Sequence, residues 1–474
     1  MAGFEMVRGN GKSTTISVDS VEQLRGTLRG ELLKKGDDGY DEARTIWNAM
    51  IDRKPAIIAR CAGAADVINA VNFAREQGLL TAVRSIGHNI AGNAVCDNGL
   101  MIDLSAMRSV RIDPEAQLAH VEPGVTLGDF DREAQMFGLV TPLGINSTTG
   151  VAGLTLGGGF GWLSRKYGMT VDNLVAADVV TAEGRLLRAS EQENQDLFWA
   201  IRGGGGNFGV VTRFEFRLHP METAKLCGMI VFSLDEAKSI MKKYREFTAG
   251  LGDDTSAWVV LREAPPLPFL PEKVHGTKVL VVAVFHAGDP DKGKKTVDPI
   301  RGFGTVLGEY VDVMPFTAWQ SVFDPLLAPG ARNYWKSHNF VELSDDTIDI
   351  AVRYASESVS PQSEIFFAQL GGAINRVAAD ATAYPHRDAG FVLNVHGRWD
   401  DAAEDDKVIS WAREFYRETS PFATGGVYIN FMTEDETDRI NSAYGAGYDR
   451  LLKAKKKYDP ENLFRLNQNI DPNK

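Results

Sequence analysis

Cysteine is scarce in this sequence, and long hydrophobic runs are missing from it. Only 3 of its 474 residues are cysteine, too few for a disulfide framework in a chain this long and typical of the reducing cytoplasm. No apolar run approaches the roughly 18 residues of a membrane span. The segment 1–20 is polar and lacks the apolar core of a secretion signal. We therefore expect a cytoplasmic protein with no membrane partner.

Basic charge is also in deficit. Lysine and arginine total 51 against 63 acidic residues, which gives a net charge of −12 and disfavours nucleic acid or an anionic membrane surface as a partner. Glycine, by contrast, is abundant at 47 residues and clusters, which marks places where backbone must approach something closely. The length favours two domains.

Two short motifs are misleading. Gly11-Lys12-Ser13-Thr14 resembles the end of a phosphate-binding P-loop, but Met6 stands where the first glycine of that motif belongs, and no hydrophobic strand precedes it. Asn146-Ser147-Thr148 has the form of a glycosylation site, which has no consequence without export.

The order of expected elements changes near residue 222. Before it, short strands alternate with helices at 65–77, 127–137 and 196–201, as in a nucleotide-binding half-domain. After it, alternating strands and two helical segments predict an antiparallel sheet with helices on one side. The whole chain is therefore expected to be α+β.

The first candidate site is the loop Arg84-Ser85-Ile86-Gly87-His88-Asn89, directly after an apolar strand. A cation, a hydroxyl and several backbone N–H groups in one turn suit a dinucleotide pyrophosphate, because nests of amides bind anions. Gly87 lets the backbone approach such a ligand closely. Taken alone, the hexapeptide is equally compatible with an ordinary loop whose histidine is hydrogen-bonded locally.

Two glycine-rich segments extend this interpretation. Six of the twelve residues from Gly150 to Gly161 are glycine, and their backbone entropy opposes a robust helix or strand. We interpret the segment as a bare wall against a flat, extended ligand, with a structural turn as the alternative. Gly203 to Gly209 repeats the pattern.

These segments resemble the berberine bridge enzyme family, within the wider vanillyl-alcohol-oxidase superfamily. Loop 84–89 is similar to its flavin-attachment loop, 149–161 to its second FAD-contact loop, and 458–470 to its terminal signature. The resemblance implies a two-domain PCMH-type FAD-binding fold. Its parts would be an FAD-binding domain at 1–222, a substrate-binding domain at 223–430 built on an antiparallel sheet flanked by helices, and a C-terminal segment at 431–474 that returns to the FAD domain.

By this resemblance, His88 bonds to the 8α-methyl carbon of FAD, which should raise the flavin potential. Many family members add a second bond from a cysteine that Asn146 replaces here, so one covalent bond is expected; Cys96 is a weak substitute. Asn467 and Asn469 carry amides that suit the flavin edge, unless they cap the tail. The other expected FAD contacts are Arg84, Ser85, Ile86, Gly87, Asn89, Thr149, Gly150, Gly153, Gly157, Gly158 and Gly161.

The family base is often the tyrosine of a Tyr-x-Asn motif, which Tyr428 and Asn430 match. A phenol with a pKa near 10 needs help from its surroundings to act at neutral pH, and Tyr428 as a core residue is the alternative. Acidic or tyrosine side chains of some relatives align approximately with Ala368 and Asn394 here. His396 shares a strand face with Asn394 and is a second acid/base candidate or a histidine satisfied within the sheet.

The resemblance thus implies an FAD-dependent oxidase that moves a hydride from a CH–OH or CH–NH group to flavin N5 and reduces O₂ to H₂O₂, without a metal. Asn394, His396 and Asn430 are the expected substrate contacts. A single flavin bond and no clear sugar-stacking row favour a small alcohol or amine. Two alternatives stay open: a dehydrogenase with another electron acceptor, and a flavin-binding protein whose acid/base groups have decayed. The presence of Tyr428, the candidate base, favours an enzyme over a flavin-binding protein without activity.

Overall fold

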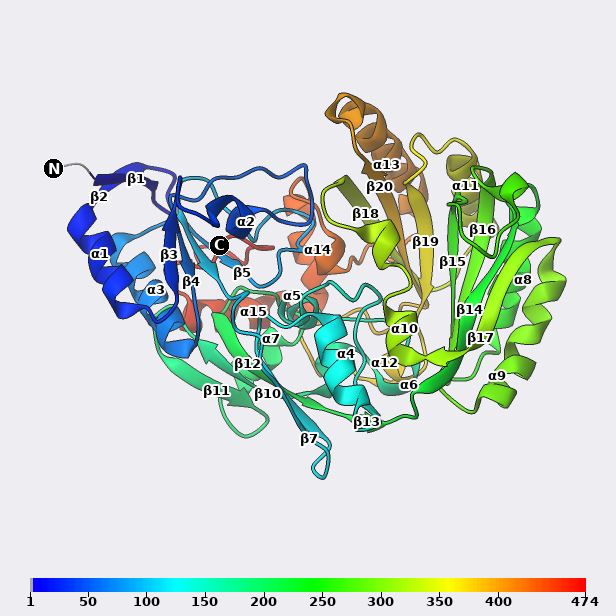
Figure 1. Ribbon diagram of the computed structural model, residues 1–474, viewed down its shortest axis with the longest axis horizontal. Coiled ribbons are helices and arrows are strands. Elements are labelled where there is room, and N and C mark those ends of the chain that lie inside the picture. The colour runs from blue at the N-terminus through cyan, green and yellow to red at the C-terminus, as the bar shows by residue number, and fades with distance from the viewer. Residues whose placement is uncertain (1–2) are drawn as a thin grey trace.

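The computed structural model describes residues 3–474. Figure 1 shows two regions side by side: one formed by the first 220 residues with the C-terminal segment, the other built on one large sheet. Within residues 3–474, no helix is long and apolar enough to cross a membrane.

The first region contains two sheets that share its core with helices. The smaller is mixed, and its last three strands run parallel in the order β3 (Glu31–Lys34), β4 (Ile57–Arg60), β6 (Leu100–Asp103), β5 (Thr81–Arg84). The larger is antiparallel, in the order β11 (Leu186–Ser190), β10 (Leu174–Val180), β12 (Val210–Arg217), β8 (Leu118–Val121), β7 (Val110–Asp113). A third pair joins β9 (Leu139–Val140) to β13 (His219–Pro220). The helices are α1 (Val18–Thr27), α2 (Tyr40–Arg44), α3 (Ala64–Gln77), α4 (Leu127–Gln135), α5 (Val151–Leu156), α6 (Ser164–Tyr167) and α7 (Gln195–Ile201).

An N-terminal hairpin precedes this core. Strands β1 (Gly3–Val7) and β2 (Ser13–Ser17) pair with Val7 opposite Ser13, so the P-loop-like residues 11–14 form a hairpin turn and the start of a strand. A phosphate-binding loop would instead open a helix.

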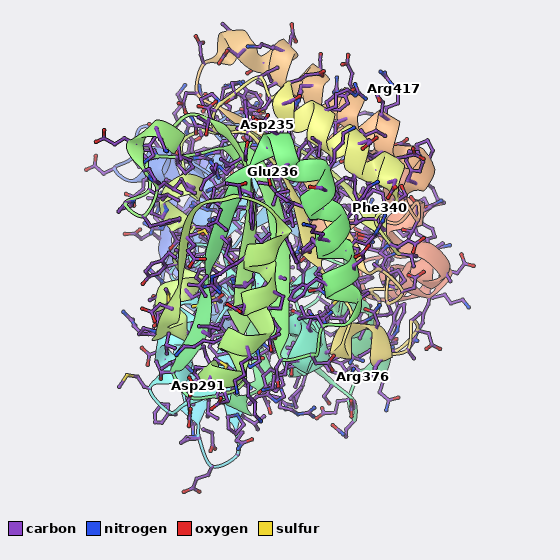
Figure 2. The ribbon with its side chains drawn as sticks, turned by 90° about the vertical axis from the view of Figure 1, so that its right-hand side faces the viewer. Asp235, Glu236, Asp291, Phe340, Arg376 and Arg417 are labelled. Carbon is purple, nitrogen blue, oxygen red and sulfur yellow. The ribbon has the colours of Figure 1, made fainter. Side chains whose placement is uncertain are left out.

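The second region is a seven-stranded antiparallel sheet. Its order is β17 (Val306–Pro315), β14 (Ala224–Ser233), β16 (Lys278–His286), β15 (Thr255–Glu263), β19 (Glu364–Gln369), β20 (Phe391–Trp399), β18 (Arg332–Phe340). The outer face is apolar and is covered by α8 (Ala237–Ala249), α9 (Pro290–Val297), α11 (Asp345–Ser356) and α13 (Asp405–Thr419). Figure 2 views this side, with Asp235 and Glu236 at the start of α8. The helix-flanked sheet expected from the sequence is confirmed.

The inner face of this sheet turns toward the first region. Alternate strand residues share a face, so Ile365 and Phe367 enter the outer core while Glu364 and Phe366 face inward. Two shorter helices, α10 (Phe316–Gln320) and α12 (Ala373–Arg376), lie beside the strands. The inner face forms one wall of the site described below.

The chain then returns to the first region, as the red segment of Figure 1 shows. After α14 (Ile440–Tyr444), helix α15 (Tyr448–Tyr458) packs on α7. The fully buried Lys455 ammonium lies 2.7 Å from the Asp459 carboxylate and also donates to the carbonyls of Asn207 and Phe464. This pair fixes the tail beside the third glycine cluster, because a buried charge needs both a partner and hydrogen bonds.

Candidate functional site

One cavity runs between the inner face of the seven-stranded sheet and the loops of the first region. Loop 85–89, the segment Thr149 to Leu154, and Gly205, Gly206 and Gly209 form the side in the first region. The tail adds Leu466 to Gln468. The three glycine-containing segments singled out in the sequence therefore meet at one site.

His88 lines this cavity and also a smaller surface cleft that shares Trp47 and Ile86 with it. Its ring stacks on Trp47, with centroids 5.4 Å apart and an interplanar angle of 18°. Nε2 lies 3.2 Å from the hydroxyl of Thr148, and Nδ1 lies 3.5 Å from that of Thr149. Burial lowers the pKa of His88 to about 4, so at neutral pH the imidazole is uncharged and keeps a nitrogen lone pair.

Not every residue expected at the cofactor lies on the cavity wall. The Arg84 guanidinium lines the smaller cleft and donates to the Ala43 carbonyl. Ser85 lines the cavity, but its hydroxyl donates to the Pro123 carbonyl at 2.5 Å. Asn467 is on the wall with its amide oxygen buried and unpartnered; Asn469 also has an unpartnered amide oxygen but is not on the wall.

The end of the glycine-rich segment packs beneath the Tyr-x-Asn motif. Gly150 and Gly153 line the cavity, whereas Gly157, Gly158 and Gly161 do not. A Cβ on Gly157 would clash with the Asn430 side chain, and Gly158 has a φ of +124° that disfavours other residues. Part of the segment forms the short helix α5, although its glycine content argued against a robust helix.

Neither Asn146 nor Cys96 presents a thiol to the cavity. Asn146 lines the cavity, and its side-chain oxygen accepts from the Thr148 hydroxyl at 2.7 Å. Cys96 is buried in a separate cluster with Tyr40 and Met101, away from the cavity wall.

Tyr428 is fully buried and lines the cavity. Its oxygen accepts from the backbone N–H of Gly159 at 3.1 Å and from the amide of Asn430 at 2.9 Å. Burial raises the pKa of Tyr428 to about 12, and the two donors oppose this rise because they favour the phenolate. The remaining hydroxyl proton is free to face a ligand.

The sheet wall carries a polar row that sequence reasoning missed. Strand pairing sets Arg262 opposite Glu364, Glu364 opposite His396, and His396 opposite Trp335, and all four line the cavity. Only His396 was expected. A glutamate alternating with Phe366 on one strand face was the available signal; its neighbours across the sheet were not visible in the sequence.

Asn394 lies two residues before His396 on β20, opposite Phe366. It lines the cavity, and its amide oxygen has no hydrogen-bond partner. Ala368 lies on the same face of β19 as Phe366, but it is buried in the core cluster with Trp258 and Tyr428 and does not line the cavity. Around these groups the cavity is aromatic and aliphatic, with Phe160, Trp258, Phe366 and Phe431 among its residues.

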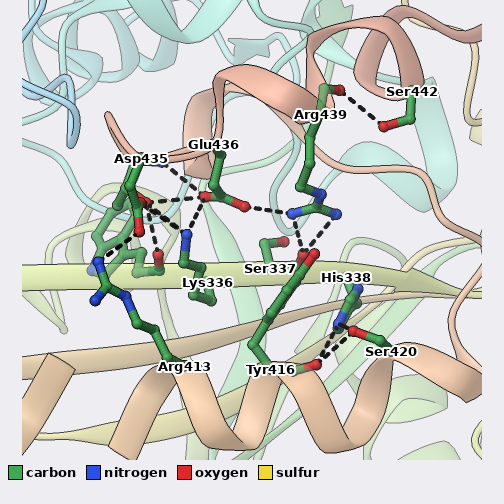
Figure 3. A network of polar contacts seen from close by, with 12 residues as sticks. Lys336, Ser337, His338, Arg413, Tyr416, Ser420, Asp435, Glu436, Arg439 and Ser442 are labelled. Carbon is green, nitrogen blue, oxygen red and sulfur yellow. Dashed lines mark hydrogen bonds and ion pairs between the residues drawn. The ribbon is translucent and has the colours of Figure 1, made fainter. Parts of the chain in front are cut away.

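A charged network holds the segment that follows Tyr428 (Figure 3). Lys336 of β18 lies 2.9 Å from Asp435 and 3.3 Å from Glu436, and Arg413 of α13 adds a 2.8 Å contact to Asp435. Arg439 pairs with Glu436 at 2.5 Å. The network fastens this segment to the outer layers of the sheet region.

The residues present fit an FAD. Bare backbone at Gly150, Gly206 and Gly209 forms an extended wall, and at Gly153 and Gly206 an added Cβ would meet nothing within 4 Å. Gly87, with a φ of +88°, presents the loop beside His88. A flat ring system and a diphosphate need such a surface together with unpaired amide groups.

Comparison with known proteins agrees with this geometry. A family model described as "FAD binding domain" matches residues 55–190, and one described as "Berberine and berberine like" matches 427–471. The chain is 30% identical over 455 residues to an FAD-linked oxidoreductase of Dictyostelium discoideum, covering 95% of this chain and 97% of the relative. It is 31% identical over 466 residues to (R)-6-hydroxynicotine oxidase of Paenarthrobacter nicotinovorans, covering 94% and 97%.

A solved structure has the same overall fold as this chain. 6-Hydroxy-D-nicotine oxidase from Arthrobacter nicotinovorans superposes with a TM-score of 0.85 at 30% identity, covering 94% of this chain and 98% of the other.

Proposed function

The chain belongs to the berberine bridge enzyme-like family of FAD-linked oxidoreductases, which act on alcohols or amines, and we propose that it is an oxidase whose FAD is bound covalently through His88 alone. Its reactants would be a small organic alcohol or amine and O₂, in the cytoplasm. The chemistry that FAD supplies when bound is acceptance of a hydride at N5 and delivery of the electrons to O₂, which yields H₂O₂.

One observation carries the proposal: the uncharged, stacked imidazole of His88 lining a glycine-walled cavity. Stacking on Trp47 restrains the ring, and a neutral imidazole retains the lone pair that a bond to carbon requires. Asn146 in place of a cysteine supports a single attachment.

Tyr428 is proposed to hold the substrate heteroatom and, in its ionised phenolate form, to take the proton of that heteroatom as hydride leaves the adjacent carbon. The donors from Gly159 and Asn430 support this role because they stabilise the phenolate that results from ionisation. The apolar walls of the cavity exclude water from the reacting groups.

A panel of small alcohols, cyclic amines and oligosaccharides, added to the purified yellow protein, tests this function. We expect a small alcohol or amine to bleach the flavin absorbance and release H₂O₂ in air. Reduction by long oligosaccharides alone would contradict the substrate class, and a reduced flavin that lasts minutes in air would show a dehydrogenase.

A further inference from the structure

The hydrogen bonds around His88 determine which of its ring nitrogens carries the proton. The side-chain oxygen of Asn146 accepts from the backbone N–H of Thr148 at 3.0 Å, which distinguishes it from the amide nitrogen. The same oxygen lies 2.7 Å from the Thr148 hydroxyl, which must therefore donate its single proton to it. The Thr148 oxygen can then only accept from His88 Nε2, which lies 3.2 Å away. Nε2 is therefore the protonated nitrogen.

The other ring nitrogen keeps its lone pair. Burial lowers the pKa of His88 to about 4, so at neutral pH the ring holds one proton, the one on Nε2. Nδ1 lies 3.5 Å from the Thr149 hydroxyl, which is too long for a strong hydrogen bond. The lone pair of Nδ1 is therefore available to another group.

The partners of the two nitrogens belong to different spaces. Thr149, beside Nδ1, lines the large cavity with the glycine wall. Thr148, beside Nε2, lines the smaller cleft, whose charged residues are Arg84, Asp129 and Arg132. The lone pair is thus held next to the cavity wall and the proton next to a cleft that opens at the surface.

We propose that Asn146 and Thr148 are positioning residues for flavin attachment, which hold the His88 proton on the side of the smaller cleft and release it to solvent there. The proposal rests on the proposed function, since it concerns the same covalent bond. Asn146 takes the Thr148 hydroxyl proton, which leaves the Thr148 oxygen as an acceptor for Nε2–H. Without this pair, a ring protonated on Nδ1 would present an N–H to the cofactor in place of a lone pair.

The step balances with O₂ as the oxidant. Attachment joins Nδ1 to the 8α-methyl carbon and breaks one C–H bond of that methyl group and the Nε2–H bond. The two hydrogens leave as two protons and two electrons, which convert O₂ to H₂O₂. In the product Nε2 is unprotonated, and the Thr148 hydroxyl can turn from Asn146 to donate to it.

The test follows attachment in protein from riboflavin-limited cells, incubated with FAD in air at pH 6 to 9. Covalent flavin is the fluorescence that stays with the denatured protein. The wild-type rate should change less than threefold over this range, because the ring is neutral and its proton has an acceptor throughout. Thr148→Val should be at least tenfold slower at pH 7 and recover toward pH 9, where hydroxide takes the Nε2 proton. Thr148→Ser keeps the hydroxyl and should stay within threefold of wild type.

Asn146 supplies a second, independent pair of variants. Asn146→Leu frees the Thr148 hydroxyl proton to bond Nε2, which favours the wrong tautomer, and attachment at pH 7 should again fall at least tenfold. Asn146→Asp keeps an acceptor oxygen and should stay within threefold of wild type. Thr45→Val is the matched control: Thr45 lines the same cleft, but its hydroxyl donates to the Asp41 carbonyl, so the rate should not change.

Total bound flavin is measured before denaturation in every sample. Wild-type rates in Thr148→Val or Asn146→Leu would overturn the proposal, as would a loss in Thr148→Val that is the same at every pH, which indicates a structural defect. If Thr148→Val binds no flavin, the Asn146 variants decide, and equal rates in Leu and Asp overturn it. Wild-type protein without acid-stable flavin would contradict the covalent bond itself, whereas attached flavin with indifferent variants removes the roles of Asn146 and Thr148 alone.

Discussion

Trp47 stacks on His88 while its indole N–H donates to the carbonyl of Leu327 at 2.7 Å. Leu327 ends a short 3-10 helix between β17 and β18 of the seven-stranded sheet, and Trp335 of that sheet packs edge-on against the same indole at 5.6 Å. The orientation of the proposed attachment residue in the first region therefore depends on contacts with the second.

Trp47→Ala should slow covalent attachment of the flavin. An aromatic pair of this kind contributes about 0.5–1.5 kcal/mol, so the attachment rate should fall roughly 2- to 10-fold, measured as flavin fluorescence in denatured protein over time. Trp47→Phe keeps a stacking ring and should stay closer to wild type. Equal rates in all three proteins would show that stacking does not align His88.

Tyr428→Phe should lower the rate of flavin reduction roughly 100-fold or more, the range lost with a general base. Because the pKa of Tyr428 is raised to about 12, the wild-type rate should increase with pH between 7 and 10, and the variant should lose this slope. Stopped-flow absorbance measures both. Tyr384→Phe is the control: this neighbouring hydroxyl is buried without a partner, so its removal should change the rate less than threefold.

Asp131→Asn should stabilise the protein at alkaline pH. Asp131 is buried in α4, and burial raises its pKa to about 7 despite a 2.8 Å hydrogen bond from Gln320. The unfolded carboxyl ionises near 3.9, so the wild-type protein loses stability as pH rises from about 4 to 7. The neutral variant avoids this loss and should gain about 1–3 kcal/mol at pH 8, with little gain at pH 4.

Thermal unfolding midpoints at the two pH values measure the difference. Asp129→Asn, two residues away, has the opposite expectation: Asp129 pairs with Arg108 at 2.7 Å and has a lowered pKa. The Asp129→Asn variant should therefore show no gain in thermal stability at pH 8. A pH-independent effect of Asp131→Asn would rule out its titration as the cause.

Lys336→Met should loosen the segment after Tyr428, because Asp435 and Glu436 lose a shared, buried partner (Figure 3). Breaking such a pair from one side costs about 3 kcal/mol, seen in denaturant unfolding and faster proteolysis within 427–439. Lys242→Met breaks an exposed pair with Asp345 and should cost less than about 1 kcal/mol. Equal losses in the two variants would contradict a special role for the network.

Loop 85–89 and Tyr428 line one cavity. The loop was singled out from its residue types, whereas Tyr428 was singled out because Tyr428 and Asn430 resemble a family motif; the roles of both stay predictions. The helices at 65–77 and 196–201 followed from apolar spacing and agree with α3 and α7 to within one residue.

The row of Arg262, Glu364 and His396 was not predictable, because its contacts depend on the register between strands whose paired residues lie 102 positions (Arg262 and Glu364) and 32 positions (Glu364 and His396) apart. Periodicity assigns each residue a strand face, but not the residue opposite it. The same limit applies to Trp47, whose stacking partner lies in another loop, and to Gly157, whose tight packing depends on Asn430 from the other end of the chain.

The central claim is a covalent bond between His88 and FAD, and acid precipitation tests it most directly. The wild-type pellet should stay yellow, and a proteolytic peptide containing His88 should carry the added mass of the flavin, while His88→Ala should release its colour into the supernatant. A colourless wild-type pellet with all flavin in solution would contradict the account.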